Sequence, residues 1–432
     1  MFVSDCLGVN EEGHLTIGGC DTVALAKRFG TPLYVMDEDQ IRKNCRAFTQ
    51  SMNEYYDGMG SVCFASKAFC CLEMCRIAFQ EGLKLDVCSM GEYYTALKAG
   101  VPAKNCRMHG NYKTEEELYF EIETGIGAII ADNIEELERI DRLAGEIGTC
   151  PHVLLRVKPG IDAHTHDFVR TGQIDSKFGL ALETGEAMEA VKYSLDCKNL
   201  NLTGFHSHIG SQIFDIEPFE HNARVMLEFI AKVKEETGFV TQELDLGGGF
   251  GIKYTESDNP APFGEYLKRV SAVIKEKSAE LGIIAPEISI EPGRSIVGAT
   301  GITLYNVGAV KNIPGIRTYV LIDGGMYEDP RYALYKSEYK IVNACRANAP
   351  EDSVITLAGR CCESGDLIGE NMKVAELKNN DTVAVLSTGA YNFSMASNYN
   401  RFARPAVIMI KDGKPRLIVY RQSVQDLIAG DI

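Results

Sequence analysis

The sequence lacks an excess of basic residues: 44 lysines and arginines stand against 60 aspartates and glutamates, a formal net charge of -16. Because phosphate backbones and anionic membrane surfaces repel such a chain, we expect neither nucleic acid nor a membrane as a partner. The sequence also lacks a window apolar enough to span a bilayer, and residues 1–6 do not read as the start of a secretion signal. We therefore expect a cytoplasmic protein.

The paired cysteine spacing of a zinc site is absent too. Fourteen cysteines are scattered along the chain, and their closest group, Cys70, Cys71 and Cys75, has no paired C-x-x-C pattern. Free thiols are favoured over a disulfide framework in a large chain without a secretion signal, and we expect no metal site. Cys361 and Cys362 differ from the others because their surroundings are polar and turn-like.

Two nucleotide-binding fingerprints are missing: no G-x-G-x-x-G follows the first strand of the repeat, and there is no P-loop. The chain instead alternates short apolar runs with amphipathic, helix-like stretches. The apolar runs are 62–66, 83–88, 106–109, 128–131, 153–157, 202–208, 243–246 and 287–290, and the helix-like stretches include 114–124, 134–147, 217–237 and 262–281. This alternation predicts an α/β fold, namely a parallel (β/α)8 barrel of the TIM type. An open doubly wound sheet is the alternative.

The 432 residues exceed one typical core, which predicts two domains. After Gly298 the pattern changes to β-like runs at 302–309, 318–322, 354–357, 382–386 and 406–410. We expect residues 31–299 to form the barrel. Residues 1–30 and 300–432 are expected to form a β domain that carries substrate-specificity and dimer-interface residues.

Reactive or anion-binding residues stand at the carboxyl ends of almost all predicted barrel strands, where barrel enzymes place their chemistry. They are Lys67, Asp86, His109, Arg156, His206, His208, Gly247 to Gly249, Glu291 and Arg294. Lys67 closes the first apolar run. If this lysine enters a pocket, it loses solvation, its pKa falls, and its amine becomes a nucleophile toward an aldehyde such as pyridoxal phosphate. A solvated strand end is the alternative reading of Lys67.

The other strand ends suit the same cofactor. The glycines at 247–249 allow backbone amides to approach a phosphate closely. Glu291 and Arg294 flank a Pro-Gly turn, and such a pair fits a ligand with a basic ring nitrogen and an anionic group. His208 is a candidate to lie flat on the ring, and Ser211 is a candidate to bind the phosphate.

Several motifs, in order along nearly the whole chain, resemble the fold-type III pyridoxal phosphate decarboxylases and, within them, the diaminopimelate decarboxylase family. The matching stretches are 64–68, 109–111, 171–172 with 175–179, 206–212, 247–249, 291–295, 323–326, 330–331 with Tyr335, 362–364 and 389–392. The resemblance implies an alanine racemase-like barrel followed by a Greek-key or β-sandwich domain. It also implies pyridoxal 5'-phosphate as cofactor.

The resemblance further implies a role for each matched residue. Lys67 would bind the cofactor covalently, His208 would stack on its ring and Glu291 would hold its ring nitrogen. The remaining cofactor-binding residues would be Asp86, Ser211, Gly248, Gly249, Gly293, Arg294 and Tyr391. The family builds its active site at a dimer interface, so a homodimer is expected in which Cys362 and Glu363 of one subunit reach the other subunit's site.

By the same resemblance the reaction is decarboxylation of meso-2,6-diaminopimelate to L-lysine and carbon dioxide, the last step of lysine biosynthesis. The non-reacting end of this substrate carries a carboxylate and an ammonium group. Arginine and glutamate side chains suit these two charges. The implied substrate-binding residues are Arg294, Arg331, Tyr335, Glu363 and Tyr391. Cys362, or a water that it orders, would return a proton to the reacting carbon.

Two residues depart from the family pattern: Met90 stands where glycine is usual, and Tyr112 where asparagine is usual. The alternatives are therefore a decarboxylase of D-ornithine or D-lysine and, from another class, an amino acid racemase of the alanine racemase type. The stretch Cys362-Glu363 counts against the racemase. A non-catalytic cofactor-binding protein is a third alternative.

Overall fold

The computed structural model describes residues 2–161 and 176–432. The predicted motif at Thr171, Gly172 and Asp175 lies outside these described residues. The chain divides into two compact units. The β-rich unit contains Met1–Lys43, Ile252–Asn259 and Arg294–Ile432, and the barrel unit contains Asn44–Gly251 and Pro260–Gly293.

The barrel unit contains a closed sheet of eight parallel strands, so the predicted (β/α)8 barrel is confirmed and the open-sheet alternative is wrong. The strands are β5 (Gly60–Ala65), β6 (Lys84–Val87), β7 (Cys106–Met108), β8 (Ala128–Ala131), β9 (His152–Lys158), β11 (Asn201–Ser207), β12 (Glu243–Asp245) and β13 (Glu287–Ile290). Closure comes from the pairing of β13 with β5 and of β8 with β9. A short further strand, β10 (Leu180–Ala181), pairs with β9.

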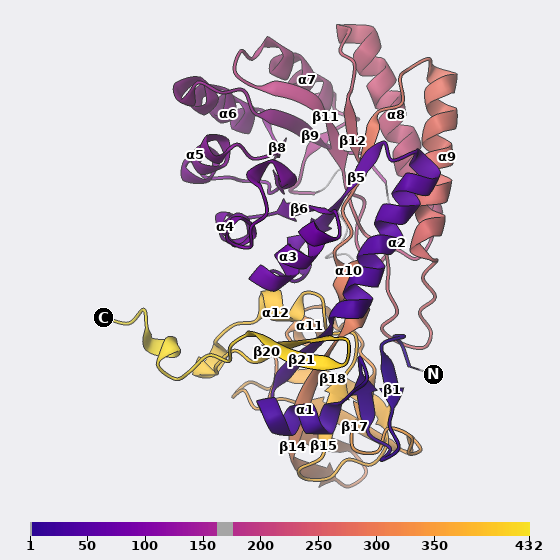
Figure 1. Ribbon diagram of the computed structural model, residues 1–432, viewed down its shortest axis with the longest axis vertical. Helices are drawn as coiled ribbons and strands as arrows, with labels where there is room; N and C mark the ends of the chain where they lie inside the picture. Colours follow the sequence, from indigo (N-terminus) through magenta and orange to yellow (C-terminus); the bar gives the residue numbers. More distant parts are fainter. Residues whose placement is uncertain (1, 162–175) are drawn as a thin grey trace. The chain divides into compact units, whose positions relative to one another are not determined.

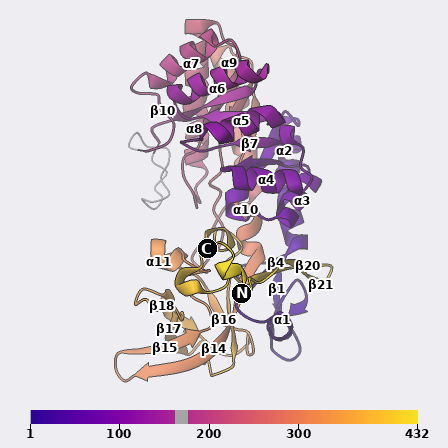
Figure 2. The same ribbon diagram turned by 90° about the vertical axis from the view of Figure 1, so that its left-hand side faces the viewer.

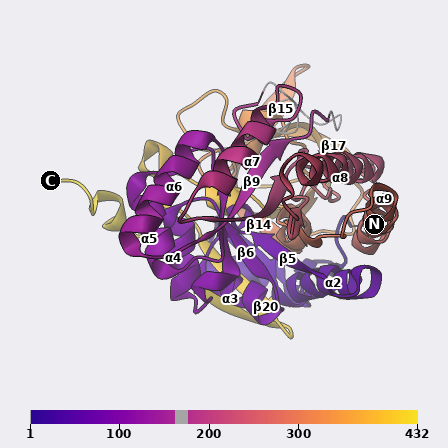
Figure 3. The same cartoon turned by 90° about the horizontal axis from the view of Figure 1, so that it is seen from above.

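Helices alternate with these strands, and Figure 3 shows them arranged around the barrel strands. They are α2 (Glu38–Tyr56), α3 (Leu72–Gln80), α4 (Met90–Lys98), α5 (Glu115–Thr124), α6 (Ile134–Ile147), α7 (Glu186–Asp196), α8 (Glu217–Thr237) and α9 (Phe263–Leu281). Local sequence explains the ends of α5: Thr114 and Glu117 form a capping box at its start, and Gly125 takes the left-handed conformation after its last residue.

The β-rich unit contains a small sheet, β1 (Leu7–Val9), β2 (Leu15–Ile17) and β3 (Cys20–Asp21), with helix α1 (Thr22–Phe29). Its larger sheet has the order β18-β17-β15-β14-β4-β20-β21, with β16 and β19 joined through β14 (Figures 1 and 2). These strands are β4 (Leu33–Asp37), β14 (Gly301–Ile313), β15 (Arg317–Ile322), β16 (Ile341–Asn343), β17 (Ser353–Ala358), β18 (Leu367–Val374), β19 (Thr382–Val385), β20 (Ala406–Lys411) and β21 (Lys414–Val419). The expected β-rich C-terminal region is confirmed.

The limits of the two units differ from the predicted limits of 31–299 for the barrel and 1–30 with 300–432 for the β domain. The reason is strand pairing, because β4 lies between β14 and β20 in the β-rich sheet. Residues 31–43 therefore cluster with that sheet, as do 252–259 and 294–299. All fourteen cysteines are free, as expected, and no described helix is long and apolar enough to cross a membrane.

Candidate active site

Lys67 lies in a 3-10 turn directly after β5, and its side chain is exposed. Glu92 of α4 fixes this turn, because its Oε2 accepts hydrogen bonds from Ser66 Oγ at 2.7 Å and from the Cys88 backbone N–H at 2.8 Å. Burial raises the pKa of Cys88 to about 12 although the charge of Lys67 opposes this, and burial together with the charge of Lys67 lowers the pKa of His208 well below its usual range. Lys67 thus lies at the strand end where the sequence predicts it, within electrostatic reach of the next strand end and of the His208 loop.

Four buried residues from four strand ends form what we call the barrel charge cluster: Asp86, His109, His206 and Glu291. The Oε1 of Glu291 lies 3.1 Å from His109 Nε2 and 3.2 Å from His206 Nε2. His109 Nε2 also lies 3.6 Å from Asp86 Oδ1. The two imidazole rings meet edge to face, with centroids 5.1 Å apart.

The cluster fixes its own protonation. Burial alone would raise the pKa of Glu291, but the charge of His109 and the close contacts with both histidines lower it well below its usual range. Burial would lower the pKa of His109, but Glu291 and Asp86 raise it to about 9. Burial lowers the pKa of His206 to about 4. At neutral pH an ionised Glu291 therefore faces a protonated His109 and a neutral His206.

The ligand atoms of His109, His206 and Glu291 lie within 4.8 Å of one another, a spacing that a metal ion also requires. Metal binding needs a neutral imidazole with a free lone pair. Because the pKa of His109 is raised to about 9, its Nε2 carries a proton at neutral pH. A cation at this position would have to displace that proton.

The loops after β11 and β12 pack too closely for any residue larger than glycine. A Cβ on Gly248 would lie 2.1 Å from the Glu291 carbonyl oxygen, and one on Gly249 would lie 2.5 Å from the Gly210 carbonyl oxygen. The Gly248 N–H donates to His208 Nδ1 at 3.2 Å, and burial together with the Lys67 charge lowers the pKa of His208 well below its usual range. A neutral, half-buried His208 is thus held in one tautomer.

Ser211 and Gly293 lie where these loops meet. Ser211 follows Gly210 in the β11 loop, and that loop is tied to the β12 loop because the Ile213 N–H donates to the Gly249 carbonyl at 2.9 Å. A Cβ on Gly293 would lie 3.0 Å from Ala65 Cβ, so glycine is required where the β13 loop approaches the turn of Lys67. The barrel unit thus collects eight of the predicted site residues at one end of its strands: Lys67, Asp86, His208, Ser211, Gly248, Gly249, Glu291 and Gly293.

Four other predicted residues gather in the β-rich unit, as what we call the arginine–tyrosine cluster: Arg294, Arg331, Tyr335 and Tyr391. The Arg294 and Arg331 guanidinium carbons lie 4.8 and 5.3 Å from the centre of the same Tyr391 ring. Arg331 also lies 5.2 Å from the Tyr335 ring. Tyr391 has φ 68°, a left-handed conformation that is costly for a tyrosine and typical of functional sites.

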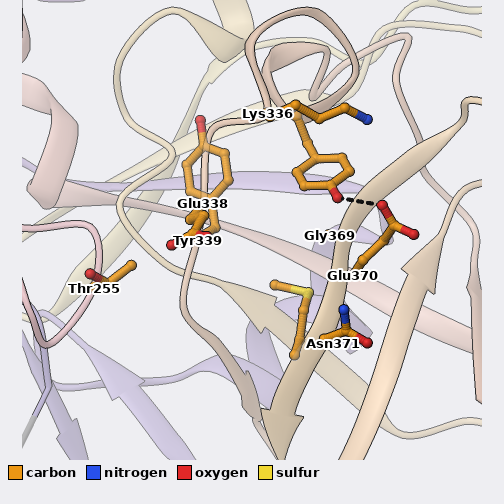
Figure 4. Close-up of a pocket in the computed structure, with 9 residues that line it drawn as sticks. Thr255, Lys336, Glu338, Tyr339, Gly369, Glu370 and Asn371 are labelled. Carbon is orange, nitrogen blue, oxygen red and sulfur yellow. Dashed lines mark hydrogen bonds between the residues drawn. The ribbon is translucent and has the colours of Figure 1, made fainter. Parts of the chain in front are cut away.

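Helix α11 (Arg331–Tyr335), which carries two of these residues, is anchored to β18. Figure 4 shows the anchor beside a pocket of about 510 Å³, where Tyr332 Oη donates to Glu370 Oε2 at 2.6 Å. Arg317 Nη1 donates to the other oxygen of Glu370 at 2.7 Å. None of the predicted site residues lines this pocket. Its lining does include Tyr332 and Glu370, whose hydrogen bond fixes α11.

Cys362 and Glu363 are exposed on the β-rich unit. The Cys362 N–H donates to Asn400 Oδ1 at 2.7 Å, and Tyr399 Oη donates to Glu363 Oε2 at 3.3 Å. The neighbouring Cys361 is buried, and burial raises the pKa of its thiol to about 12. Of the two thiols, Cys362 is the accessible one, which is the arrangement expected if it serves a second subunit.

Sequence reasoning missed two parts of the site. The sequence places His109 and His206 at strand ends but gives them no role, because a sequence does not reveal which carboxylate they face. Inside the barrel, the buried Arg107 pairs with Glu243 and donates to Asp245 Oδ2 at 3.0 Å. Asp245 in turn accepts from the Gly247 N–H at 2.9 Å, so this interior network supports the glycine loop.

The residues fit pyridoxal phosphate. Glu291 Oε1 and both carboxylate oxygens of Asp86 are buried and make no well-aligned hydrogen bond with the described residues. Glu291, whose pKa is lowered, is the ionised acceptor that a protonated ring nitrogen requires. The glycine loops leave a backbone surface without side chains at 247–249, which suits a phosphate group.

Comparisons with known proteins agree with this arrangement. Residues 38–298 match the family of the pyridoxal-dependent decarboxylase, pyridoxal binding domain. The chain is 44% identical to the diaminopimelate decarboxylase of Bacillus subtilis, over 100% of this chain and 98% of that protein. It is 46% identical to that of Staphylococcus aureus, over 98% of each. The solved diaminopimelate decarboxylase from M. jannaschii in complex with L-lysine superimposes with a TM-score of 0.92 at 35% identity, covering 100% of this chain and 99% of that one.

Proposed function

Because the chain belongs to the pyridoxal-dependent decarboxylases, we propose that it converts meso-2,6-diaminopimelate to L-lysine and carbon dioxide, the last step of lysine biosynthesis. Full-length relatives that carry out this reaction support the assignment. The single observation that carries it within the structure is the arginine–tyrosine cluster. It brings two guanidinium groups to one tyrosine ring, and an anionic substrate group is the natural partner for such a pair.

Pyridoxal 5'-phosphate is the cofactor. When bound, its protonated ring supplies an electron sink for the electron pair that carbon dioxide leaves behind. We assign its covalent attachment to Lys67, its ring nitrogen to Glu291 and its ring face to His208. The further residues proposed to surround it are Asp86, Ser211, Gly248, Gly249, Gly293, Arg294 and Tyr391. The ionised state of Glu291 and the neutral state of His208 suit these roles.

For the substrate, we assign the distal carboxylate to Arg331 with Arg294, supported by Tyr335 and Tyr391. The buried Arg331 holds its guanidinium against two rings, and its Nε has no hydrogen-bond partner among the described residues, so a substrate carboxylate could accept from this donor. A substrate without a distal carboxylate leaves these donors unpaired, which disfavours lysine and ornithine as substrates.

We propose a homodimer with shared active sites, and the exposure of Cys362 and Glu363 on the single chain supports this proposal. In this proposal Glu363 of one subunit accepts hydrogen bonds from the distal ammonium in the other subunit's site. Both residues are exposed on the single chain, and their hydrogen bonds to Asn400 and Tyr399 help to fix the stretch that carries them. Cytoplasmic location and the lack of a nucleic-acid partner stay predictions from the sequence.

The assay that tests the function uses the purified protein with pyridoxal phosphate and meso-diaminopimelate, followed for both L-lysine and carbon dioxide. Parallel reactions with D-ornithine and D-lysine test the alternative decarboxylases. A change of chirality without release of carbon dioxide would indicate a racemase instead. A chelator arm tests metal dependence, and loss of activity with chelator alone would assign the barrel charge cluster to a cation.

Lys67 is tested by borohydride trapping of the cofactor and peptide mapping. We expect the label on the peptide that contains Lys67, because reduction makes the bond between amine and aldehyde carbon permanent. Lys67→Ala should remove the label and lower kcat by roughly 10³-fold or more. Lys98→Met, an exchange on the exposed side of α4, is the matched control. A label on another peptide would refute the assignment.

Cys362 is proposed as the proton donor to the reacting carbon, with a water that it orders as the alternative. Cys362→Ala should lower kcat by about a hundredfold, within the usual range for general acid catalysis, while the cofactor stays bound. The exposed Cys150→Ala is the control and should leave kcat unchanged. An unaffected kcat in Cys362→Ala would remove this residue from the mechanism.

A further inference from the structure

Lys113 is a buried lysine in the barrel unit, only 2% exposed, four residues after His109. Its Nζ donates to three acceptors: Glu136 Oε1 at 2.6 Å, the Ile130 carbonyl at 2.8 Å and the Gly110 carbonyl at 3.1 Å. An ammonium group has three N–H donors, so all of them are used. Lys113 thereby joins the loop after β7 to the end of β8 and to α6.

The charge balance around Lys113 explains why it is a lysine. Glu136 is fully buried, and its ion pair with Lys113 is the contact that compensates its charge. Two more acids, Glu121 of α5 and Asp132 at the end of β8, face the same region, and burial raises the pKa of both. From α6, Arg139 Nη1 donates to the Lys113 carbonyl at 2.8 Å, which fixes the backbone of the lysine as well.

The loop between His109 and Lys113 has an unusual course. The His109 N–H donates to the Val87 carbonyl at 2.8 Å, which holds the start of the loop at the end of β6. Gly110 follows with φ 125°, a conformation that residues with a side chain rarely adopt. The Gly110 carbonyl then points at Lys113 Nζ. Lys113 therefore fixes the orientation of the Gly110–Asn111 peptide, one residue beyond His109.

We propose that Lys113 is a positioning residue that holds His109 against Glu291 through its hydrogen bond to the Gly110 carbonyl. His109 in turn faces Glu291, Asp86 and the His206 ring, the three charged or titratable groups that contact it from other strand ends. The catalytic consequence of this placement rests on the proposed function. The placement itself belongs to the chain and is measurable without substrate.

Three variants separate a positioning role from a merely structural ion pair. Lys113→Met leaves the Glu136 carboxylate buried without its partner, so it should lose stability. The double variant Lys113→Met with Glu136→Met replaces both charges by apolar side chains of similar volume, an exchange that often restores stability. It still removes the donor to Gly110. Lys113→Arg keeps the charge, and exposed Lys98→Met is the control.

The first readout is the titration of the His109 ring by NMR in the full chain without cofactor, its signal identified by its loss in His109→Asn. In the wild-type protein we expect a pKa near 9, and in the double variant a pKa shifted toward the ordinary 6.5, because Glu291 and Asp86 are no longer held at contact distance. The second readout is cofactor affinity by absorbance titration, expected to fall on the order of tenfold in the double variant.

A double variant with wild-type stability, a wild-type His109 titration and wild-type cofactor affinity would overturn the proposal, because Lys113 would then be half of a structural ion pair. Restored stability with a shifted His109 titration supports it. Partial recovery of the titration in Lys113→Arg supports it further. If the chain forms no lysine from diaminopimelate, the proposed function fails, whereas the His109 titration still decides the role of Lys113.

Discussion

The barrel charge cluster and the arginine–tyrosine cluster treat buried charge in opposite ways. In the barrel unit, Glu291 meets His109 at 3.1 Å and His206 at 3.2 Å, so charge is compensated by the chain itself. In the β-rich unit, the buried Arg331 lies against the Tyr335 and Tyr391 rings, and its Nε has no hydrogen-bond partner among the described residues. The barrel charge cluster therefore pairs opposite charges within itself, whereas in the arginine–tyrosine cluster Arg331 faces aromatic rings and keeps an unused donor.

This difference indicates different kinds of ligand. A carboxylate whose ionisation is fixed by neighbouring histidines is ready for a group that stays bound, such as the ring nitrogen of a cofactor. A guanidinium held by aromatic faces keeps its charge and its N–H donors for an anion that enters and leaves at each turnover. Variants of the barrel charge cluster should therefore affect the cofactor, and variants of Arg331 should affect KM.

Among the variants that test this comparison, Glu291→Gln should have the largest effect, because an amide has no charge to hold the ring nitrogen protonated. We expect kcat to fall by about a hundredfold or more and cofactor affinity to fall with it. The pKa of His109, now raised to about 9 by Glu291 and Asp86 against its burial, should move down toward 6.5. Steady-state kinetics, absorbance titration of the cofactor and NMR titration of His109 measure the three changes.

Stability gives an independent check on the same variant. A histidine with a raised folded pKa contributes stability that is fully present below 6.5 and is lost as the pH rises through about 9. The melting temperature of the cofactor-free wild type should therefore fall between pH 6.5 and 9, and the melting temperature of Glu291→Gln should fall less over the same range. Equal pH dependence in the two proteins would contradict the charge pairing described for the barrel.

A smaller effect is expected from Arg331→Met, which removes the predicted grip on the distal carboxylate. One lost charged hydrogen-bonding partner corresponds to roughly 1 to 3 kcal/mol, so kcat/KM for meso-diaminopimelate should fall between about 5-fold and 150-fold. The ratio of kcat/KM for meso-diaminopimelate to that for D-lysine should fall by the same factor. Kinetics with both substrates measures it.

The control for this comparison is Arg346→Met, which removes an arginine that pairs with Asp381 at the surface of the same unit. It should leave the substrate ratio unchanged. Cofactor affinity should also stay unchanged in Arg331→Met. A parallel loss of cofactor affinity would remove the distinction between the two clusters, because Arg331 would then act on the cofactor as well.

The sequence was sufficient for most of the fold. The predicted helices at 134–147 and 217–237 coincide with α6 and α8, because amphipathic periodicity over many residues is a strong signal. The partner of β4 was not predictable, since a short apolar run is compatible with either sheet, and pairing with β14 and β20 is decided by residues far along the chain.

The site was predictable where the chemistry of one residue carries the signal, as for Lys67 at a strand end. It was not predictable where function depends on contacts distant in sequence. Arg107 in a strand resembles an exposed residue, yet it is buried and donates to Asp245, 138 positions away. Lys113 likewise reads as a surface lysine until Glu136 and the Gly110 carbonyl are seen beside it.

Asp329 is a buried acid of the β-rich unit, and its charge should affect how Arg331 binds an anion. It is fully buried, it precedes Arg331 by two residues, and neither of its carboxylate oxygens makes a well-aligned hydrogen bond with the described residues. Burial raises its pKa to about 7, although the charge and backbone N–H of Arg331 act in the opposite direction. Tyr34 and Tyr339 are among the groups whose pKa its charge raises.

The smallest effect is expected from Asp329→Asn. Above about pH 7 the wild-type carboxylate is ionised, and its charge near Arg331 weakens the attraction for a substrate carboxylate by about 1 kcal/mol, so KM should rise roughly fivefold from pH 6 to pH 8. In Asp329→Asn, KM should be nearly independent of pH.

The same variant should also be more stable at high pH. The folded pKa of Asp329 is raised from 3.8 to about 7, so ionising this acid destabilises the folded protein progressively as the pH rises from 3.8 to about 7. Asp329→Asn should therefore melt at a higher temperature than the wild type at pH 8. Glu121→Gln, at a buried glutamate of the barrel unit whose pKa is raised to about 8, should change the pH dependence of stability but not that of KM. A change of KM with pH that persists in Asp329→Asn would assign it to a group outside the arginine–tyrosine cluster.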